Sequence, residues 1–233
     1  MLAQIGILLR QELRSEWRNP YTLVGILLYV LAAVLIAYVA LTRFSIMVWN
    51  PIFWILLFFA AISATGRSFR LEQGRRQLYY YTLISPEALL LSKLIYNTFV
   101  LVILGLLLWG LLIFFNGSDP VVGPGEQVIS TSIGNPISDN TSFLLALFLG
   151  SLGLSAAFSF VAAIATRAGG NATLMSILAF PLVIPLLILL VRVGAYAIGL
   201  LSGSTSQLLS LLMAIDLLLI ATGVVLFPYI WRD

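Results

Sequence analysis

Long uncharged runs of apolar residues, separated by short charged segments, form the dominant pattern along this chain. A helix that crosses a bilayer core of about 30 Å needs about 20 mostly apolar residues. Six runs meet this requirement, and they predict transmembrane helices at about 20–42, 50–66, 89–115, 142–166, 171–191 and 207–230. We therefore predict an all-α integral membrane protein with six spans, in one domain that covers residues 1–233.

Start signals precede three of these helices. Asn19-Pro20, Asn50-Pro51 and Ser85-Pro86 each combine an N-cap residue with a proline that suits the first helical position. Glu87 then falls in the first turn of the third helix, where the helix dipole favours a carboxylate.

The residues before the first span have the periodicity of an amphipathic helix at 3–18. One apolar stripe recurs at every fourth position, and it consists of Ile5, Leu9, Leu13 and Trp17. Basic residues flank the stripe on one side and acidic residues on the other, namely Arg10, Arg14 and Arg18 against Glu12 and Glu16. We predict that this helix lies in the headgroup region; the alternative is a short charged tail that leads into the first span.

Composition and charge support this assignment and fix an orientation. The chain is 61% hydrophobic and 9% charged, whereas soluble domains are about a quarter charged. If the amino terminus is cytoplasmic, ten of the twelve Lys and Arg residues lie on the cytoplasmic side, and only Arg43 and Arg192 lie outside. Both termini are therefore predicted to be cytoplasmic. The net charge of +3 lies beside the spans, which favours contact with lipid headgroups and not with nucleic acid.

The absence of cysteine and histidine excludes disulfides, thiol chemistry and histidine metal sites. We accordingly predict no catalytic residues, no metal site and no directly bound cofactor. The segment from Asn116 to Ser142 has no Lys or Arg and forms the outer loop between the third and fourth helices. A loop of this length is either functional or a flexible connector.

Polar and irregular residues inside the spans have two interpretations each. Pro181 and Pro185 predict a kink in the fifth helix, because proline removes a backbone hydrogen bond. The kink is either a moving part or static packing. Asp216 is an acid within the last span, where it serves either a proton relay or a structural hydrogen bond. No second charge inside a span is apparent, which favours a hydrogen bond to a Ser or Thr of the bundle.

The stretch from Arg67 to Lys93 combines basic and aromatic residues between two apolar spans. We predict that residues 66–73 extend the second helix, that Gly74 turns the chain, and that residues 75–84 form a second short helix before Ser85-Pro86. The chain has no G-x-x-x-x-G-K-[ST] phosphate loop, so an ATP-driven role requires a separate ATPase. The candidate residues for docking it are Arg67, Arg70, Glu72, Gly74, Arg75, Arg76, Leu78, Tyr81 and Pro86.

The same stretch resembles the CcmB family, the membrane subunit of the bacterial haem exporter in cytochrome c maturation. The matching residues are Arg67, Ser68, Phe69, Glu72, Gly74, Leu78, Ser85, Pro86 and Lys93. Residues 11–20 and 166–190 are also similar to the family, and the resemblance is weakest in the outer loop and the last helix. The chain departs from the family at Tyr79, Tyr80 and Tyr81, where aliphatic residues are usual.

The resemblance implies an ABC-2-type permease in the bacterial inner membrane, with no enzymatic activity of its own. It implies a CcmA-like ATPase partner, CcmC-like and CcmD-like membrane proteins, a CcmE-like haem chaperone and two copies of the chain per complex. The implied function is haem export, or ATP-driven release of the haem-loaded chaperone. The alternatives are a generic ABC-2 permease for a lipid or polysaccharide and an ion-coupled transporter or membrane enzyme. Asp216 alone gives the last of these little support.

Overall fold

The fold is taken from a computed structural model, and the residues that it describes are 2–18, 21–41, 46–70, 85–116, 121–122, 128–130, 136–167 and 172–232. Seven helices occupy most of these ranges: α1 Leu2–Arg18, α2 Tyr21–Leu41, α3 Ile46–Arg70, α5 Pro86–Asn116, α6 Asn140–Arg167, α7 Ala172–Ala197 and α8 Ser206–Arg232. Two short antiparallel strands, β1 (Val121–Val122) and β2 (Val128–Ser130), lie within the predicted outer loop.

Five of the described helices are long and apolar enough to cross a membrane. This protein is therefore a multi-pass membrane protein. Their apolar segments are Met47–Thr65, Pro86–Phe115, Asn140–Ala165, Ile177–Ala197 and Ser206–Tyr229. α2 contains a shorter apolar segment, Val24–Ala40. The all-helical class is confirmed, and the predicted short helix at 75–84 lies outside the described residues.

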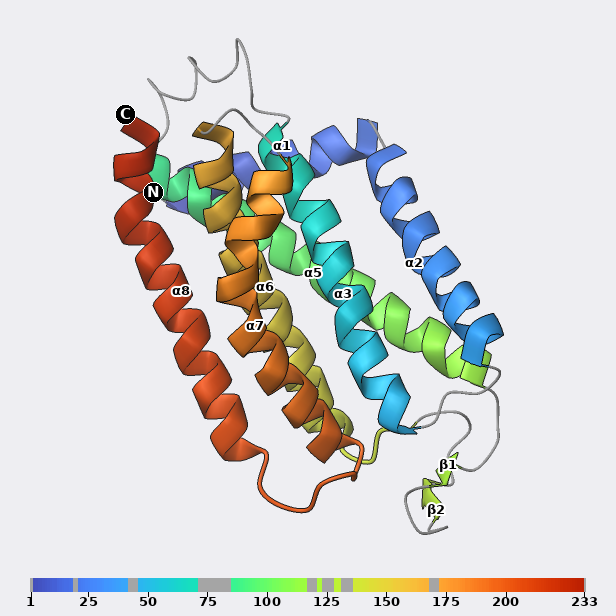
Figure 1. The fold of residues 1–233 in the computed structure, drawn as a ribbon. Coiled ribbons are helices and arrows are strands. Elements are labelled where there is room, and N and C mark those ends of the chain that lie inside the picture. The colour runs from blue at the N-terminus through green and yellow to red at the C-terminus, as the bar shows by residue number, and fades with distance from the viewer. Residues whose placement is uncertain are drawn as a thin grey trace.

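The helices α2, α3, α5, α6, α7 and α8 alternate in direction, while α1 lies across one end of the bundle (Figure 1). The start of α1 and the end of α8 are both at this end, which we call the α1 end. The strands β1 and β2 lie at the opposite end, which we call the hairpin end. α5 runs obliquely behind the bundle, from beside α8 to beside α2. With 31 residues it is about 46 Å long, so a tilt accommodates it in a bilayer core of about 30 Å.

α6 lies inside the bundle, where it packs against α3, α5, α7 and α8. Between helices in lipid, association depends on close packing rather than on removing apolar surface from water. Small residues on α6 permit that packing. A β-carbon at Gly150 would stand 2.7 Å from Leu190 Cδ2 of α7 and 3.2 Å from the Trp54 ring of α3.

The prediction that Asn50-Pro51 begins a helix is wrong. α3 begins at Ile46, and Pro51 lies inside it. The Asn50 side chain is buried instead of capping a helix end: its Nδ2 donates to Val191 O at 2.7 Å, and its Oδ1 accepts from Trp54 Nε1 at 2.9 Å. The amide therefore connects α3 to α7, which a local start signal does not reveal.

The prediction for Ser85-Pro86 is confirmed, since α5 begins at Pro86 and has Glu87 in its first turn. Leu89 N donates to Ser85 O at 3.2 Å, so Ser85 supplies the first carbonyl of the helix. Asn19-Pro20 lies outside the described residues.

At the hairpin end, residues before α6 are bound to the end of α7. Ser138 N and Asp139 N donate to Ala197 O at 3.0 and 2.9 Å, and Ser138 Oγ donates to the same oxygen at 2.8 Å. The Asp139 carboxylate caps α6 by accepting from Thr141 N and Ser142 N at 3.1 and 3.2 Å. Its hydrogen bonds with Ser142, and then with Thr141, lower the pKa of the Asp139 carboxyl, although slight burial opposes them.

Candidate functional site

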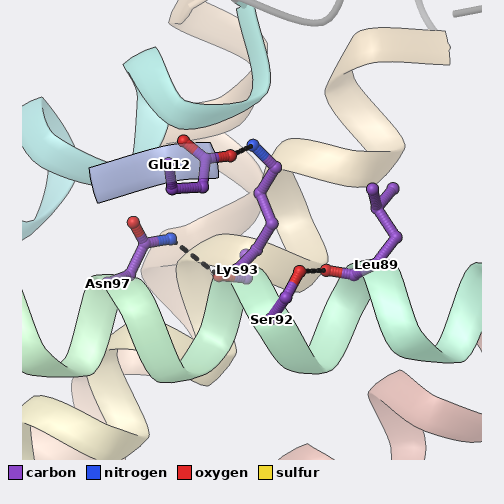
Figure 2. Close-up of polar contacts among 6 residues, drawn as sticks. Glu12, Leu89, Ser92, Lys93 and Asn97 are labelled. Atoms are coloured by element: carbon purple, nitrogen blue, oxygen red, sulfur yellow. Dashed lines mark hydrogen bonds and ion pairs between the residues drawn. The ribbon is translucent and has the colours of Figure 1, made fainter. Parts of the chain in front are cut away.

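The junction between α1 and the first turns of α5 contains the main cluster of polar and charged contacts among the described residues. Ile5 and Leu8 of α1 are buried, and the two helices pack against each other. Ser85 Oγ, just before α5, donates to Gln4 Oε1 at 3.2 Å. Two turns further along α1, Glu12 reaches Lys93 of α5 (Figure 2). α1 is thus fixed to α5 at two points as well as through its apolar face.

The ion pair between Lys93 and Glu12 is the most unusual feature of this junction. Lys93 Nζ lies 2.7 Å from Glu12 Oε1, and the two side chains are 1% and 18% exposed. Lys93 lies about two turns from the start of α5, within the apolar segment Pro86–Phe115. A charge at such a position requires a partner, because lipid and apolar side chains cannot solvate it. Glu12 provides that partner from a helix outside the bundle.

The buried face of α1 differs from the predicted one. The predicted stripe of Ile5, Leu9, Leu13 and Trp17 is wrong in part, because Leu13 is 52% exposed. The buried positions Ile5 and Leu8 instead lie on the same face as Glu12. This face meets α5, where Glu12 pairs with Lys93, so the amphipathic helix is confirmed with a rotated contact face. Its location in a headgroup region stays a prediction.

Beyond Lys93, the same stretch of α5 meets α6 through buried polar groups. Asn97 Nδ2 donates to Ser159 Oγ at 3.2 Å, and Ser155 Oγ donates to Leu94 O at 3.0 Å. Thr98 Oγ1 also donates to Leu94 O, at 2.8 Å. Each group has a partner, as the interior of a membrane bundle requires. α5 therefore makes polar contacts with both α1 and α6, through Lys93 and Asn97 one turn apart on the same face.

Most of the predicted docking residues lie outside the described residues: Glu72, Gly74, Arg75, Arg76, Leu78 and Tyr81. Arg67 and Arg70 are in the last turn of α3, and Pro86 is the half-buried first residue of α5. The end of α3 and the start of α5 are both at the α1 end of the bundle (Figure 1). The docking role of this stretch stays a prediction, and its two flanks lie at the same end of the bundle as the α1–α5 junction.

The predicted hydrogen bond from Asp216 to a Ser or Thr is wrong. Asp216 is 1% exposed, and neither carboxylate oxygen has a hydrogen-bond partner among the described residues. The carboxyl faces Gly153 of α6, where a β-carbon would overlap Asp216 Oδ1. Ser155 and Ser159 of α6 bond to α5 instead.

Both prolines predicted to lie inside the fifth span are inside α7. Pro181 and Pro185 are inside α7, which is helical from Ala172 to Ala197, and both side chains are exposed. Pro228 is a third proline inside a helix, in α8. The kink at Pro181 and Pro185 stays a prediction.

Sequence reasoning missed the Lys93–Glu12 pair and counted Lys93 among the cytoplasmic charges. A signal was present, because Lys93 falls inside the predicted span 89–115 and a charge there needs a partner. The amphipathic helix before the first span offers Glu12 and Glu16 as acids.

The chain matches no model of a known protein family and shows no significant similarity to a curated protein. Among the described residues, no group of three His, Cys, Asp or Glu side chains is placed to hold a metal ion. The charged and polar groups at the α1–α5 junction are paired with one another. This arrangement suits mechanical connection between helices, and it is the basis for the function proposed next.

Proposed function

We propose that this chain is a six-span permease subunit of a CcmB-like ABC transporter, driven by a separate ATPase that docks on residues 67–93. The observation that supports the proposal is the attachment of α1 to the start of α5 by the buried Lys93–Glu12 pair, at 2.7 Å. This junction is at the same end of the bundle as the end of α3 and the start of α5, the two helices that flank residues 71–84 in the sequence.

The sixth span in this proposal is α2. It has 21 residues and a length of about 31 Å, which equals the thickness of a bilayer core. It packs against α3 and α5, both of which have segments long and apolar enough to cross a membrane. Six alternating spans leave both termini on one side, and the distribution of Lys and Arg favours the cytoplasm for that side.

The α1–α5 junction gives a route from the docking stretch into the bundle. A force on residues 71–84 acts on the end of α3 and on the start of α5, because these helices adjoin the stretch directly. At α5 the force reaches α1 through Glu12 and α6 through Ser155 and Ser159. The sequence has no phosphate loop, so ATP is bound and hydrolysed in the partner.

The cargo and the further partners follow from the resemblance to the CcmB family. They are haem, moved by the complex or carried by a CcmE-like chaperone, together with CcmA-like, CcmC-like and CcmD-like subunits. Two copies of this chain and the bacterial inner membrane complete the proposal. The second candidate is a generic ABC-2 permease for a lipid or polysaccharide, which shares the helices and the docking stretch.

The test is affinity purification of the chain in mild detergent, with and without the double substitution Arg75→Glu/Arg76→Glu. We expect the native chain to retain an ATPase and the variant to lose it, because the basic pair is reversed in charge. The matched control is Arg43→Glu/Arg192→Glu, which changes the net charge equally on the predicted outer side. Normal ATPase yield with the Arg75/Arg76 variant contradicts the docking role.

The same preparation separates the two candidate cargoes. A haem absorbance spectrum and haem-handling proteins in the purified native complex support the CcmB-like role. A complex that contains an ATPase but neither haem nor haem-handling proteins favours the generic permease.

A further inference from the structure

The Asp216 carboxyl occupies an unusual position halfway along α8. It lies ten residues after Ser206 and sixteen before Arg232, which places it about 15 Å from the hairpin end of the helix. It is 1% exposed and faces Gly153 of α6, with Leu186 of α7 beside it. Gly153 is required here, because any larger residue would overlap the carboxyl.

Neither oxygen of this carboxyl has a hydrogen-bond partner among the described residues. The helices packed against α8 are α5, α6 and α7. α6 has no charged residue from Asn140 to Ala165, and the described side chains of α7 include one charge, the exposed Arg192. On α5, Lys93 pairs with Glu12, and Glu87 is another acid, in the first turn. The charge that would neutralise an Asp216 carboxylate is therefore absent from its described surroundings.

These surroundings favour the neutral, protonated carboxyl over the ionised carboxylate. An ionised carboxylate without partners costs many times more to bury than the neutral acid, which carries no net charge. Bound Ca²⁺ or Mg²⁺ would require several further oxygen ligands, and no cluster of such side chains is present among the described residues. A proton is the one cation that the carboxyl can bind with no other ligand.

We propose that the Asp216 carboxyl is a proton-binding site inside the bundle, and that the contact between α6 and α8 at Gly153 forms around its neutral form. Loss of the proton leaves an unsolvated carboxylate against Gly153. The charge then has to be solvated by water or a cation, which requires α8 to separate from α6. Proton binding at Asp216 is thereby linked to the position of α8.

The test is modification of the purified chain in lipid nanodiscs by an apolar carbodiimide, followed by mass spectrometry of the peptides. This reagent partitions into the bilayer and adds to protonated carboxyls. We expect Asp216 to be modified and the label to decrease as pH rises from about 5 to about 9. The internal comparison is Asp139, an exposed carboxylate that caps α6 and should remain unlabelled.

A second measurement uses Asp216→Asn, which keeps the shape of the side chain and cannot ionise. The native chain should lose thermal stability relative to this variant as pH rises, because ionisation is disfavoured in the packed bundle. Absence of label at Asp216 in the folded native chain overturns the proposal, and so does a melting difference that is independent of pH. If the variant does not fold, the label on the native chain still decides the question.

Discussion

At the scale of single residues, Lys93 and Glu12 show how a membrane bundle accommodates a charge within a span. Removing two charges from water costs several kcal/mol each, and their attraction offsets that cost only when the geometry is good. The distance of 2.7 Å between Lys93 Nζ and Glu12 Oε1 satisfies this condition. The Glu12 side chain is 18% exposed, which reduces the cost of removing its charge from water. The pair therefore contributes little net stability, whereas the loss of either partner is expensive. Its main effect is to fix where α1 lies on α5.

The first prediction concerns Glu12→Gln, which removes the carboxylate that neutralises Lys93. We expect a loss of about 3 kcal/mol of unfolding free energy, measured by tryptophan fluorescence during unfolding in detergent. The double variant Glu12→Leu/Lys93→Met should recover most of this loss, because neither charge is then buried. Equal stability of Glu12→Gln and the native chain would show that the pair does not hold the two helices together.

At the scale of elements, glycine determines how closely the helices of this bundle approach one another. At Gly194 of α7, a β-carbon would overlap Asn50 Oδ1 and would stand 2.8 Å from Trp54 Nε1. The hydrogen bonds from Asn50 to Val191 and from Trp54 to Asn50 therefore depend on this glycine. The contact between α3 and α7 is thus polar and tightly packed at the same point.

The second prediction compares Gly194→Ala with Gly110→Ala. A β-carbon at Gly110 of α5 meets no atom within 4 Å, so that substitution should be neutral or slightly stabilising. Gly194→Ala should destabilise the protein by about 2 kcal/mol, because it displaces Asn50 and overfills the contact. Melting temperatures of the two variants provide the measurement. Similar values for both would mean that α7 moves aside without cost.

The helices themselves were largely predictable from the sequence, because span length and hydropathy are local properties. Contacts between spans were not. Asn50-Pro51 has the local pattern of a helix start, yet α3 begins four residues earlier and the amide bonds to Val191, far along the chain. The contact face of α1 was predicted from its apolar stripe, whereas the face that is buried includes Glu12, whose partner Lys93 is on another helix. For Asp216, the sequence identified a buried acid but not the glycine that it faces.

At the scale of the whole molecule, the alternating helices define two ends that the proposed topology assigns to opposite sides of the membrane. α1 lies at one end, and residues 198–205, which connect α7 to α8, lie at the other (Figure 1). The native chain contains no cysteine, so a single introduced cysteine reports one position without background. This property makes the topology directly measurable.

The third prediction concerns the sidedness of Arg14→Cys and Ser202→Cys, both at exposed positions. A maleimide that cannot cross membranes should label Ser202→Cys in spheroplasts, and it should label Arg14→Cys only in inverted vesicles. Labelling of both positions from the same side would contradict six spans, because α2 would then fail to cross.

The bonds from Ser138 and Asp139 to Ala197 have a consequence for motion in such a bundle. α6 and α7 are joined along the chain by residues 168–171 and are bonded together again at their far ends. Because α6 and α7 are held together at both ends, they should not separate at either end. They should therefore move together as one rigid unit. Any passage through the protein then has to widen where this pair of helices meets its neighbours α3, α5 and α8.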